Sequence, residues 1–169
     1  RLVPLKGYHE VIAALPALPG FQLMIAGDGP ERGALAALAA RLGVADRVRL
    51  LGAVAHARLP DLYGAADALV LASAREGWPN VVLEAMACGT PVVAPPVFGI
   101  AEMLAAPEAG LVIGEATAAA IAEGVGRFLA TPPDRAAIRA IAERFSWDET
   151  SQGQLALFRR VLAGARPPC

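Results

Sequence analysis

The stretch "ALVLASAREGWPNVVLEAMACGTPVVA", residues Ala68–Ala94, contains two short apolar runs on either side of a longer helical pattern. The apolar runs predict strands at Ala68–Leu71 and Pro91–Ala94, and the residues between them predict a helix at Asn80–Cys88. Asn80 is a suitable N-cap for this helix. A strand, a helix and a second strand in this order form a βαβ unit, whose two strands are parallel.

The same alternation of short apolar runs and longer helical patterns continues on both sides of this unit. Further strands are predicted at Phe21–Ala26, Val48–Leu51 and Gly110–Ile113. The other predicted helices are Glu31–Leu42, His56–Ala65, Ala116–Ala130, Ala136–Phe145 and Trp147–Ala163. The last three have no strand between them and predict a helical C-terminal tail. We therefore expect one α/β domain over residues 1–169, with a Rossmann-like parallel sheet and helices on both faces.

Charge and composition exclude several classes of partner. The 169 residues carry 15 Lys and Arg against 16 Asp and Glu, a balance that does not favour a nucleic-acid partner. No apolar run approaches the ~20 residues of a membrane span, so we expect membrane association only through another domain. The two cysteines fit a reducing cytoplasm. The opening "RLVPLKG" resembles the interior of a longer protein, and we expect a strand to precede Arg1.

In an open parallel sheet, ligands bind beyond the carboxyl ends of the strands. The loop after the strand Phe21–Ala26 reads "GDGPERG", in which Gly27, Gly29 and Gly33 resemble a dinucleotide fingerprint. The acidic residue that would hold a ribose is missing, because the next strand, Val48–Leu51, leads into "GAVAH". A tight strand-to-helix turn is therefore favoured, and an NADP-type dinucleotide-binding module stays an alternative.

Two carboxylates stand out in the loop and helix that follow the strand Ala68–Leu71. Glu76 lies in the loop and Glu84 lies one turn inside the helix, so both can reach the crevice at the edge of the sheet. The free N–H groups at a helix N-terminus favour an anion, most naturally a phosphate. A salt bridge would explain Glu84 alone and a solvated charge would explain Glu76 alone. Together they suit the hydroxyl groups of a sugar or a ribose.

Two cations lie close together at the start of the sequence. Arg1 and Lys6 are five positions apart around a proline, in the loop expected to follow a strand. There they could meet a diphosphate, with the arginine as a planar fork and the lysine as a point charge.

These blocks resemble the C-terminal, nucleotide-sugar-binding domain of the retaining GT-B-fold glycosyltransferases, a group that includes sucrose synthase and glycogen synthase. The resemblance runs in order through "RLVPLKG", "MIAGDGP", "RVRLLGAV", "LYGAADALVLAS", "REGWPNVVLEAMACGTPVVA", "GIAEML", "GLVI" and "RFSW". Its most specific part is the E-x7-E spacing of Glu76 and Glu84.

The resemblance implies that the chain binds a nucleoside diphosphate sugar, such as a UDP-sugar, and requires no metal or other cofactor. Glu76 would be the catalytic residue and hold hydroxyls of the donor sugar, and Glu84 would hold the ribose. Arg1 and Lys6 would bind the diphosphate, and Val54 would lie against the base. The other residues expected to contact the donor are Gly77, Trp78, Pro79, Asn80 and Val81.

Some features depart from the family pattern. Val97–Phe98 and Ile100–Ala101 stand where many relatives carry glycine and proline. The resemblance also implies an N-terminal acceptor-binding domain, which we expect to lie outside this sequence. We therefore expect donor binding without sugar transfer. A nucleotide-sugar epimerase stays a second alternative, although the E-x7-E block argues against it. Asp67 is expected to be a buried, hydrogen-bonded acid, and Trp147 a packing anchor.

Overall fold

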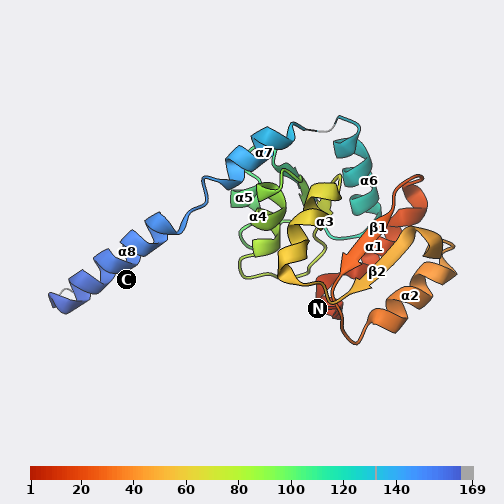
Figure 1. The fold of residues 1–169 in the computed structure, drawn as a ribbon, viewed down its shortest axis with the longest axis horizontal. Helices are drawn as coiled ribbons and strands as arrows, with labels where there is room; N and C mark the ends of the chain where they lie inside the picture. Colours follow the sequence, from red (N-terminus) through yellow and green to blue (C-terminus); the bar gives the residue numbers. More distant parts are fainter. Residues whose placement is uncertain (132, 165–169) are drawn as a thin grey trace.

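In the described part of the chain, five short parallel strands form the centre of the fold (Figure 1). The computed structural model describes residues 1–131 and 133–164, without the side chain of Glu149. Strands β1 (Leu23–Ala26) and β2 (Val48–Gly52) pair with each other, and a second sheet has the order β3-β4-β5. The bounds of the second sheet are β3 Leu69–Val70, β4 Val92–Ala94 and β5 Gly110–Val112. All five predicted strands are confirmed, although they lie in two sheets.

Eight α-helices surround the strands in the described residues. Their bounds are α1 Tyr8–Ala14, α2 Arg32–Arg41, α3 Leu59–Ala65, α4 Asn80–Ala87, α5 Ile100–Met103, α6 Ala118–Leu129, α7 Arg135–Ala142 and α8 Trp147–Leu162. Short 3-10 turns occupy Pro4–Lys6, Leu15–Ala17, Ala45–Arg47 and His56–Arg58. The six predicted helices are confirmed with shifted ends, and α1 and α5 were not predicted. None of the described helices is long and apolar enough to cross a membrane.

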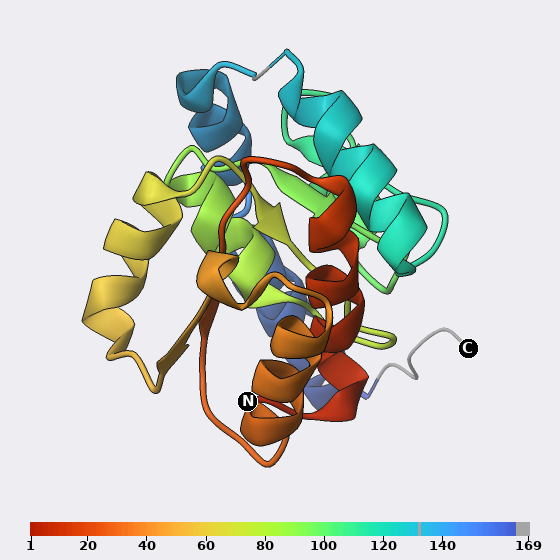
Figure 2. The same cartoon turned by 90° about the vertical axis from the view of Figure 1, so that its right-hand side faces the viewer.

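The helices cover both faces of the strands. Successive side chains of β4 point to opposite faces and are buried on both, so both faces must be covered. Val93 is buried against α1 and α6, whereas Val92 and Ala94 are buried against α4, α5 and α7 on the opposite face. Figure 2 shows α1, α2 and α6 on one side, and α3, α4 and α7 on the other. The α/β class with helices on both faces is therefore confirmed.

Helix α1 joins the two sheets on one face. Its Val11 packs in the cluster that contains Val93 of the second sheet, and its Ile12 packs in the cluster that contains Ile25 of the first. Since each cluster is fully apolar, α1 holds β1 and β3 in a fixed relation although the two strands do not pair.

Helix α8 is the helical tail that the sequence predicts, and it extends away from the rest of the protein (Figure 1). The side chain of Trp147 at its start is 80% exposed. Trp147 belongs to none of the apolar clusters of the described residues, and its expected role as a packing anchor toward the N-terminal domain stays a prediction.

Candidate functional site

Residues 1–6 lie across the carboxyl ends of β1 and β3. The N–H of Leu2 donates to the carbonyl of Asp28, 2.9 Å away in the loop after β1. The carbonyl of Leu5 accepts from the N–H of Ala74, 3.0 Å away in the loop after β3. Arg1 and Lys6 are thus brought to the same edge of the molecule as Glu76, as the sequence predicts.

Two glycines permit this close approach of backbones. Gly7 has a left-handed φ of 67°, and a Cβ there would collide with the carbonyl oxygen of Ala72. A Cβ at Gly29 would lie 2.5 Å from the carbonyl oxygen of Leu2. The "GDG" loop therefore serves to seat the first residues of the chain. This use favours the tight-turn interpretation of the loop over a dinucleotide site.

Lys6 and Glu76 form the shortest ion pair at this edge. The ammonium Nζ of Lys6 lies 2.6 Å from Oε1 of Glu76, whose side chain is only 14% exposed. Burial by itself would raise the pKa of Glu76. The hydrogen bond and charge of Lys6, with the polar contact of Ser73, outweigh it and hold that pKa below its usual value. The buried Ser73 hydroxyl meets no acceptor or donor in good hydrogen-bond geometry, so its contact with Glu76 is the weaker one.

Glu84 faces the same side of the molecule from α4, with a phenol and an imidazole beside it. The hydroxyl of Tyr63 donates to Oε2 of Glu84 over 2.9 Å, and Nε2 of His56 lies 3.9 Å from Oε1. Burial, followed by the hydrogen bond to this carboxylate, raises the pKa of Tyr63, so Tyr63 stays a donor. Among the ion pairs of the described residues, none joins Glu84 to a lysine or arginine, which removes the simple salt-bridge explanation.

Tyr63 is itself fixed by its backbone. The hydroxyl of Thr90 donates to the carbonyl of Tyr63 over 2.5 Å, and the guanidinium of Arg135 donates to Thr90 Oγ1 and to the carbonyl of Gly64. Arg135 begins α7, so the helical region after the sheet helps to hold the partner of Glu84 in place.

The sequence did not predict Tyr63 or Ser73 as members of the site. The useful signal for Tyr63 is chemical: a tyrosine in an apolar helix is usually buried in part, and its hydroxyl then needs a polar partner. The sequence does not indicate which carboxylate that partner is, since Glu84 lies 21 residues away.

The other predicted residues line the loop between β3 and α4 or lie beside it. Gly77 and Asn80 are exposed, Val81 is half-buried and Pro79 is buried. Pro79, not Asn80, is the N-cap of α4, and no side chain caps this end. The prediction of an Asn80 cap is therefore wrong, because the helix begins one residue earlier than a side-chain cap would require.

Trp78 packs against structure beyond the loop. Its ring lies 6.4 Å from that of Phe145, and a Cβ at Gly99 would lie 2.9 Å from the indole. The side chain is 40% exposed. Val54 is half-buried in the loop after β2, two residues before His56. The expected contacts of Val54 and Trp78 with the donor stay predictions.

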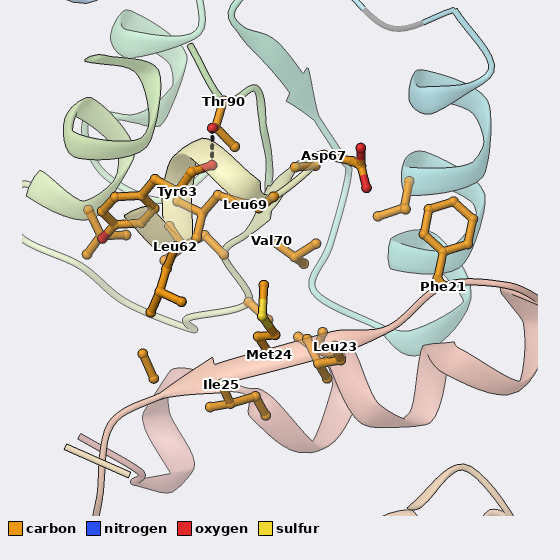
Figure 3. A pocket seen from close by; sticks show the side chains of 18 of the residues that line it. Phe21, Leu23, Met24, Ile25, Leu62, Tyr63, Asp67, Leu69, Val70 and Thr90 are labelled. Carbon is orange, nitrogen blue, oxygen red and sulfur yellow. Dashed lines mark hydrogen bonds between the residues drawn. The ribbon is translucent and has the colours of Figure 1, made fainter. Parts of the chain in front are cut away.

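A cavity of about 1100 Å³ opens beneath this edge, between β1 and β3 (Figure 3). Arg1, Lys6 and Glu84 line it toward the carboxyl ends, and apolar side chains line most of its length. Asp67 lines it as well and is exposed, so the prediction of a buried Asp67 is wrong. The cavity is larger than the cluster of polar groups, and only part of it belongs to the candidate site.

Comparison with known proteins gives the family. A family model described as glycosyl transferases group 1 matches residues 1–145. The chain belongs to the group 1 glycosyltransferases. This membership does not favour the epimerase or the dinucleotide-binding alternative.

The curated relatives carry a common name. The D-inositol 3-phosphate glycosyltransferase of Segniliparus rotundus is 36% identical over 97% of this chain and 39% of its own length. The protein of the same name from Mycobacteroides abscessus is 36% identical over 99% of this chain and 40% of its own length. The chain therefore spans about two fifths of the length of these relatives.

Solved structures share the fold. Sucrose-phosphate synthase from Thermosynechococcus elongatus has a TM-score of 0.85 at 30% identity, covering 98% of this chain and 44% of its own. HepE of Anabaena, solved in complex with UDP and glucose, has a TM-score of 0.78 at 28% identity, covering 94% and 46%. The expected Rossmann-like fold of a glycosyltransferase domain is confirmed.

Proposed function

We propose that this chain is the donor-binding part of a retaining glycosyltransferase and that it binds a nucleoside diphosphate sugar at the carboxyl edge of β1 and β3. The observation that carries the proposal is the meeting of Lys6, Glu76 and Glu84 at one edge, with both carboxylates held by named partners. The UDP and glucose of the Anabaena relative are consistent with this class of ligand.

Each group has a distinct role in the proposal. Lys6 has three N–H donors, so it can keep its bond to Glu76 and still donate to a diphosphate, which Arg1 meets from the other side. Glu76 is the catalytic residue and accepts from hydroxyls of the donor sugar. Glu84 accepts from the ribose. The loop from Gly77 to Val81 contributes backbone N–H groups, and Val54 lies against the base.

The proposal does not require a divalent metal. Arg1 and Lys6 bring two positive charges to the diphosphate, which is the electrostatic work that a metal ion performs in other phosphate sites. UDP affinity should therefore be the same with EDTA as with added Mg²⁺. A large gain in affinity with Mg²⁺ would contradict this part of the proposal.

The whole protein would add an acceptor-binding domain. Because the chain spans only about two fifths of its curated relatives, we infer that the acceptor site lies outside these residues. The isolated chain should bind donor and show no transfer to an acceptor. We place the reaction in the cytoplasm, which imaging of a tagged intact protein would check.

Calorimetric titration tests the proposal with three ligands, UDP, uridine and NADP. Lys6→Met should weaken UDP binding roughly tenfold and leave uridine binding unchanged, since a charge-assisted contact is worth ~1.5–3 kcal/mol when fully made. Arg41→Met, on the exposed side of α2, is the control. NADP binding stronger than UDP binding, or equal loss for UDP and uridine, would overturn the assignment.

A further inference from the structure

The side chain of Glu84 is 37% exposed and is held at one of its two oxygens. Oε2 accepts from the Tyr63 hydroxyl, 2.9 Å away, whereas Oε1 lies 3.9 Å from Nε2 of His56, beyond hydrogen-bond distance. A long, exposed side chain loses conformational freedom when it binds a ligand, and this loss lowers the affinity. The bond to Tyr63 removes part of that loss before a ligand arrives.

The chemistry of this partner matters, because a phenol orients the carboxylate without neutralising it. An ionised carboxylate accepts about four hydrogen bonds, so Glu84 can still accept from two neighbouring hydroxyls. Those bonds are charge-assisted and strong as long as no cation is paired with the carboxylate. Glu76 differs in this respect, since Nζ of Lys6 lies 2.6 Å from its Oε1. The pair of Tyr63 and Glu84 therefore suits a neutral diol, such as the 2′ and 3′ hydroxyls of a ribose.

Thr90 ties together the two helices that carry this pair. It is fully buried in the turn after α4. Its N–H donates to the carbonyl of Ala85, 2.9 Å away, which is the residue after Glu84 in α4. Its hydroxyl donates to the carbonyl of Tyr63 in α3 (Figure 3). One buried residue thus fixes the position of α3 relative to α4 beside both members of the pair.

Arg135, the first residue of α7, fastens the same junction from outside. Its guanidinium donates to the carbonyls of Gly64 and Ala66, over 2.8 and 3.1 Å, and to Oγ1 of Thr90 over 3.1 Å. A cation suits the end of α3, because the last carbonyls of a helix lack partners within it. The backbone of Arg135 also lies against the turn after α4, where a Cβ at Gly89 would come within 2.8 Å of the Arg135 carbonyl oxygen. Helix α7 therefore holds α3 and α4 at the point where Tyr63 meets Glu84.

Support of the fold alone does not explain the hydroxyl of Tyr63. Its ring packs against the apolar cluster that contains Val82 and Met86, a place that phenylalanine would fill equally well. The hydroxyl adds the bond to Glu84, and a carboxylate of this exposure is solvated without it. Bonds to exposed charges contribute little to folding. The orientation of Glu84 toward a ligand is the more specific use of this bond.

We propose that Tyr63 is a positioning residue for ribose recognition, held in place by Thr90 and Arg135, and that its hydroxyl strengthens the preference of the site for a ribose over a sugar without the 2′ and 3′ hydroxyls. The proposal rests on the proposed function, in which Glu84 accepts from the ribose. It makes α7, which follows the last described strand, part of the support of the nucleotide site.

Calorimetric titration with UDP and with 2′,3′-dideoxy-UDP tests the proposal, because the two ligands differ only in these hydroxyls. The wild type should bind UDP about tenfold more tightly than the dideoxy ligand, or better. Tyr63→Phe should reduce this ratio about threefold or more through a loss of UDP affinity alone. Tyr8→Phe, the same change at the other tyrosine of the chain, should leave the ratio unchanged.

Variants of Thr90 test the support of Tyr63. Thr90→Val removes the hydroxyl and should reduce the ratio in the same direction, whereas Thr90→Ser keeps the hydroxyl and should preserve the ratio. Thermal melts show whether each variant is folded at the temperature of the titration. If Thr90→Val is unfolded there, Tyr63→Phe decides the proposal, because it removes a single oxygen and keeps the packing of the ring.

Equal loss of affinity for both ligands in Tyr63→Phe, or loss for neither, would overturn the proposal. Glu84→Ala should abolish the preference for UDP, and Tyr63→Phe added to it should change neither affinity further. A further loss of UDP affinity in this double variant would also overturn the proposal, because Tyr63 would then contact the ribose itself. Equal binding of the two ligands by the wild type, or no binding of UDP, would instead overturn the proposed function, and this inference with it.

Discussion

Glu84 is a partly exposed carboxylate on a helix whose other side is buried, and a tyrosine holds it in place. Glu84→Gln keeps the size and can still accept the bond from Tyr63, so the free energy of unfolding should change little. The loss of charge should weaken UDP binding roughly fivefold, since hydrogen bonds to a charged group are worth about 1 kcal/mol more than neutral ones.

Calorimetry and thermal melts of this variant separate ligand binding from structural support. Glu123→Gln, on the exposed face of α6, is the matched control. A large fall in melting temperature with unchanged UDP affinity would mean that Glu84 supports the fold and does not bind the nucleotide.

The pair of Lys6 and Glu76 should give the protein a specific dependence on acid pH. The pKa of Glu76 is lower in the folded than in the unfolded state, so its stabilising contribution is complete above its unfolded pKa. That contribution is lost as pH falls through the lower, folded pKa. In Lys6→Met the carboxyl loses its main stabilising partner and its folded pKa rises.

The difference in unfolding free energy between wild type and Lys6→Met should therefore be largest near neutral pH and shrink below about pH 4. Urea unfolding across this range measures it, with Arg41→Met as a control of similar chemistry. A difference that stays constant down to pH 3 would mean that the ion pair adds nothing to stability.

At the scale of elements, the turn at Gly7 decides whether Lys6 reaches Glu76. Gly7 and Gly43 share a φ of 67°, but of the two only Gly7 would bring a Cβ into collision, with the backbone of Ala72 in the loop after β3. Gly43→Ala should cost about 1–2 kcal/mol for the left-handed conformation alone. Gly7→Ala adds the collision and should cost roughly 2–5 kcal/mol.

Urea unfolding of both variants measures the loss of unfolding free energy, and titration with UDP measures the change in UDP affinity. Gly7→Ala should lose UDP affinity at a temperature where it is still folded, and Gly43→Ala should not. Equal costs for the two variants would contradict the close approach of Gly7 to β3.

The five strands and the helix after "GDGP" could be predicted because their local patterns and their packing agree. Helix α1 was missed because it is seven residues long, has no side-chain cap and begins at a glycine in the left-handed conformation. Helix α5 has only four residues and carries even less local signal. The predicted N-cap at Asn80 is wrong although its local signal is strong. A residue type that favours the N-cap position does not fix the residue at which a helix starts.

At the scale of the whole molecule, α8 contributes little to the fold of this chain. Its described side chains are exposed, among them Leu155, Phe158 and Leu162. Removal of residues 147–169 should leave the melting temperature of the remaining protein nearly unchanged. Removal of everything after residue 130 should lower it strongly, because α7 supplies the buried Ile138 and the Arg135 contacts.

Differential scanning calorimetry on the two shortened chains checks this. A strong destabilisation by the first truncation would mean that α8 packs on the domain in solution.

The edge that brings Lys6 beside Glu76 could be predicted from the sequence, because the carboxyl ends of parallel strands share one edge. The cavity between β1 and β3 could not, because the neighbours of a strand are set by tertiary packing and leave no local pattern.

The two tryptophans of this chain occupy very different surroundings. Trp78 is packed on Phe145 beside Glu76, whereas Trp147 is almost fully solvated on α8. Indole emission shifts to shorter wavelength and changes in intensity as water leaves the ring, so the protein carries its own optical reporter of the donor loop. In Trp147→Phe, the remaining fluorescence should respond to UDP, and in Trp78→Phe it should not. An equal response from both variants would mean that the loop from Glu76 to Asn80 is not where the nucleotide changes the protein.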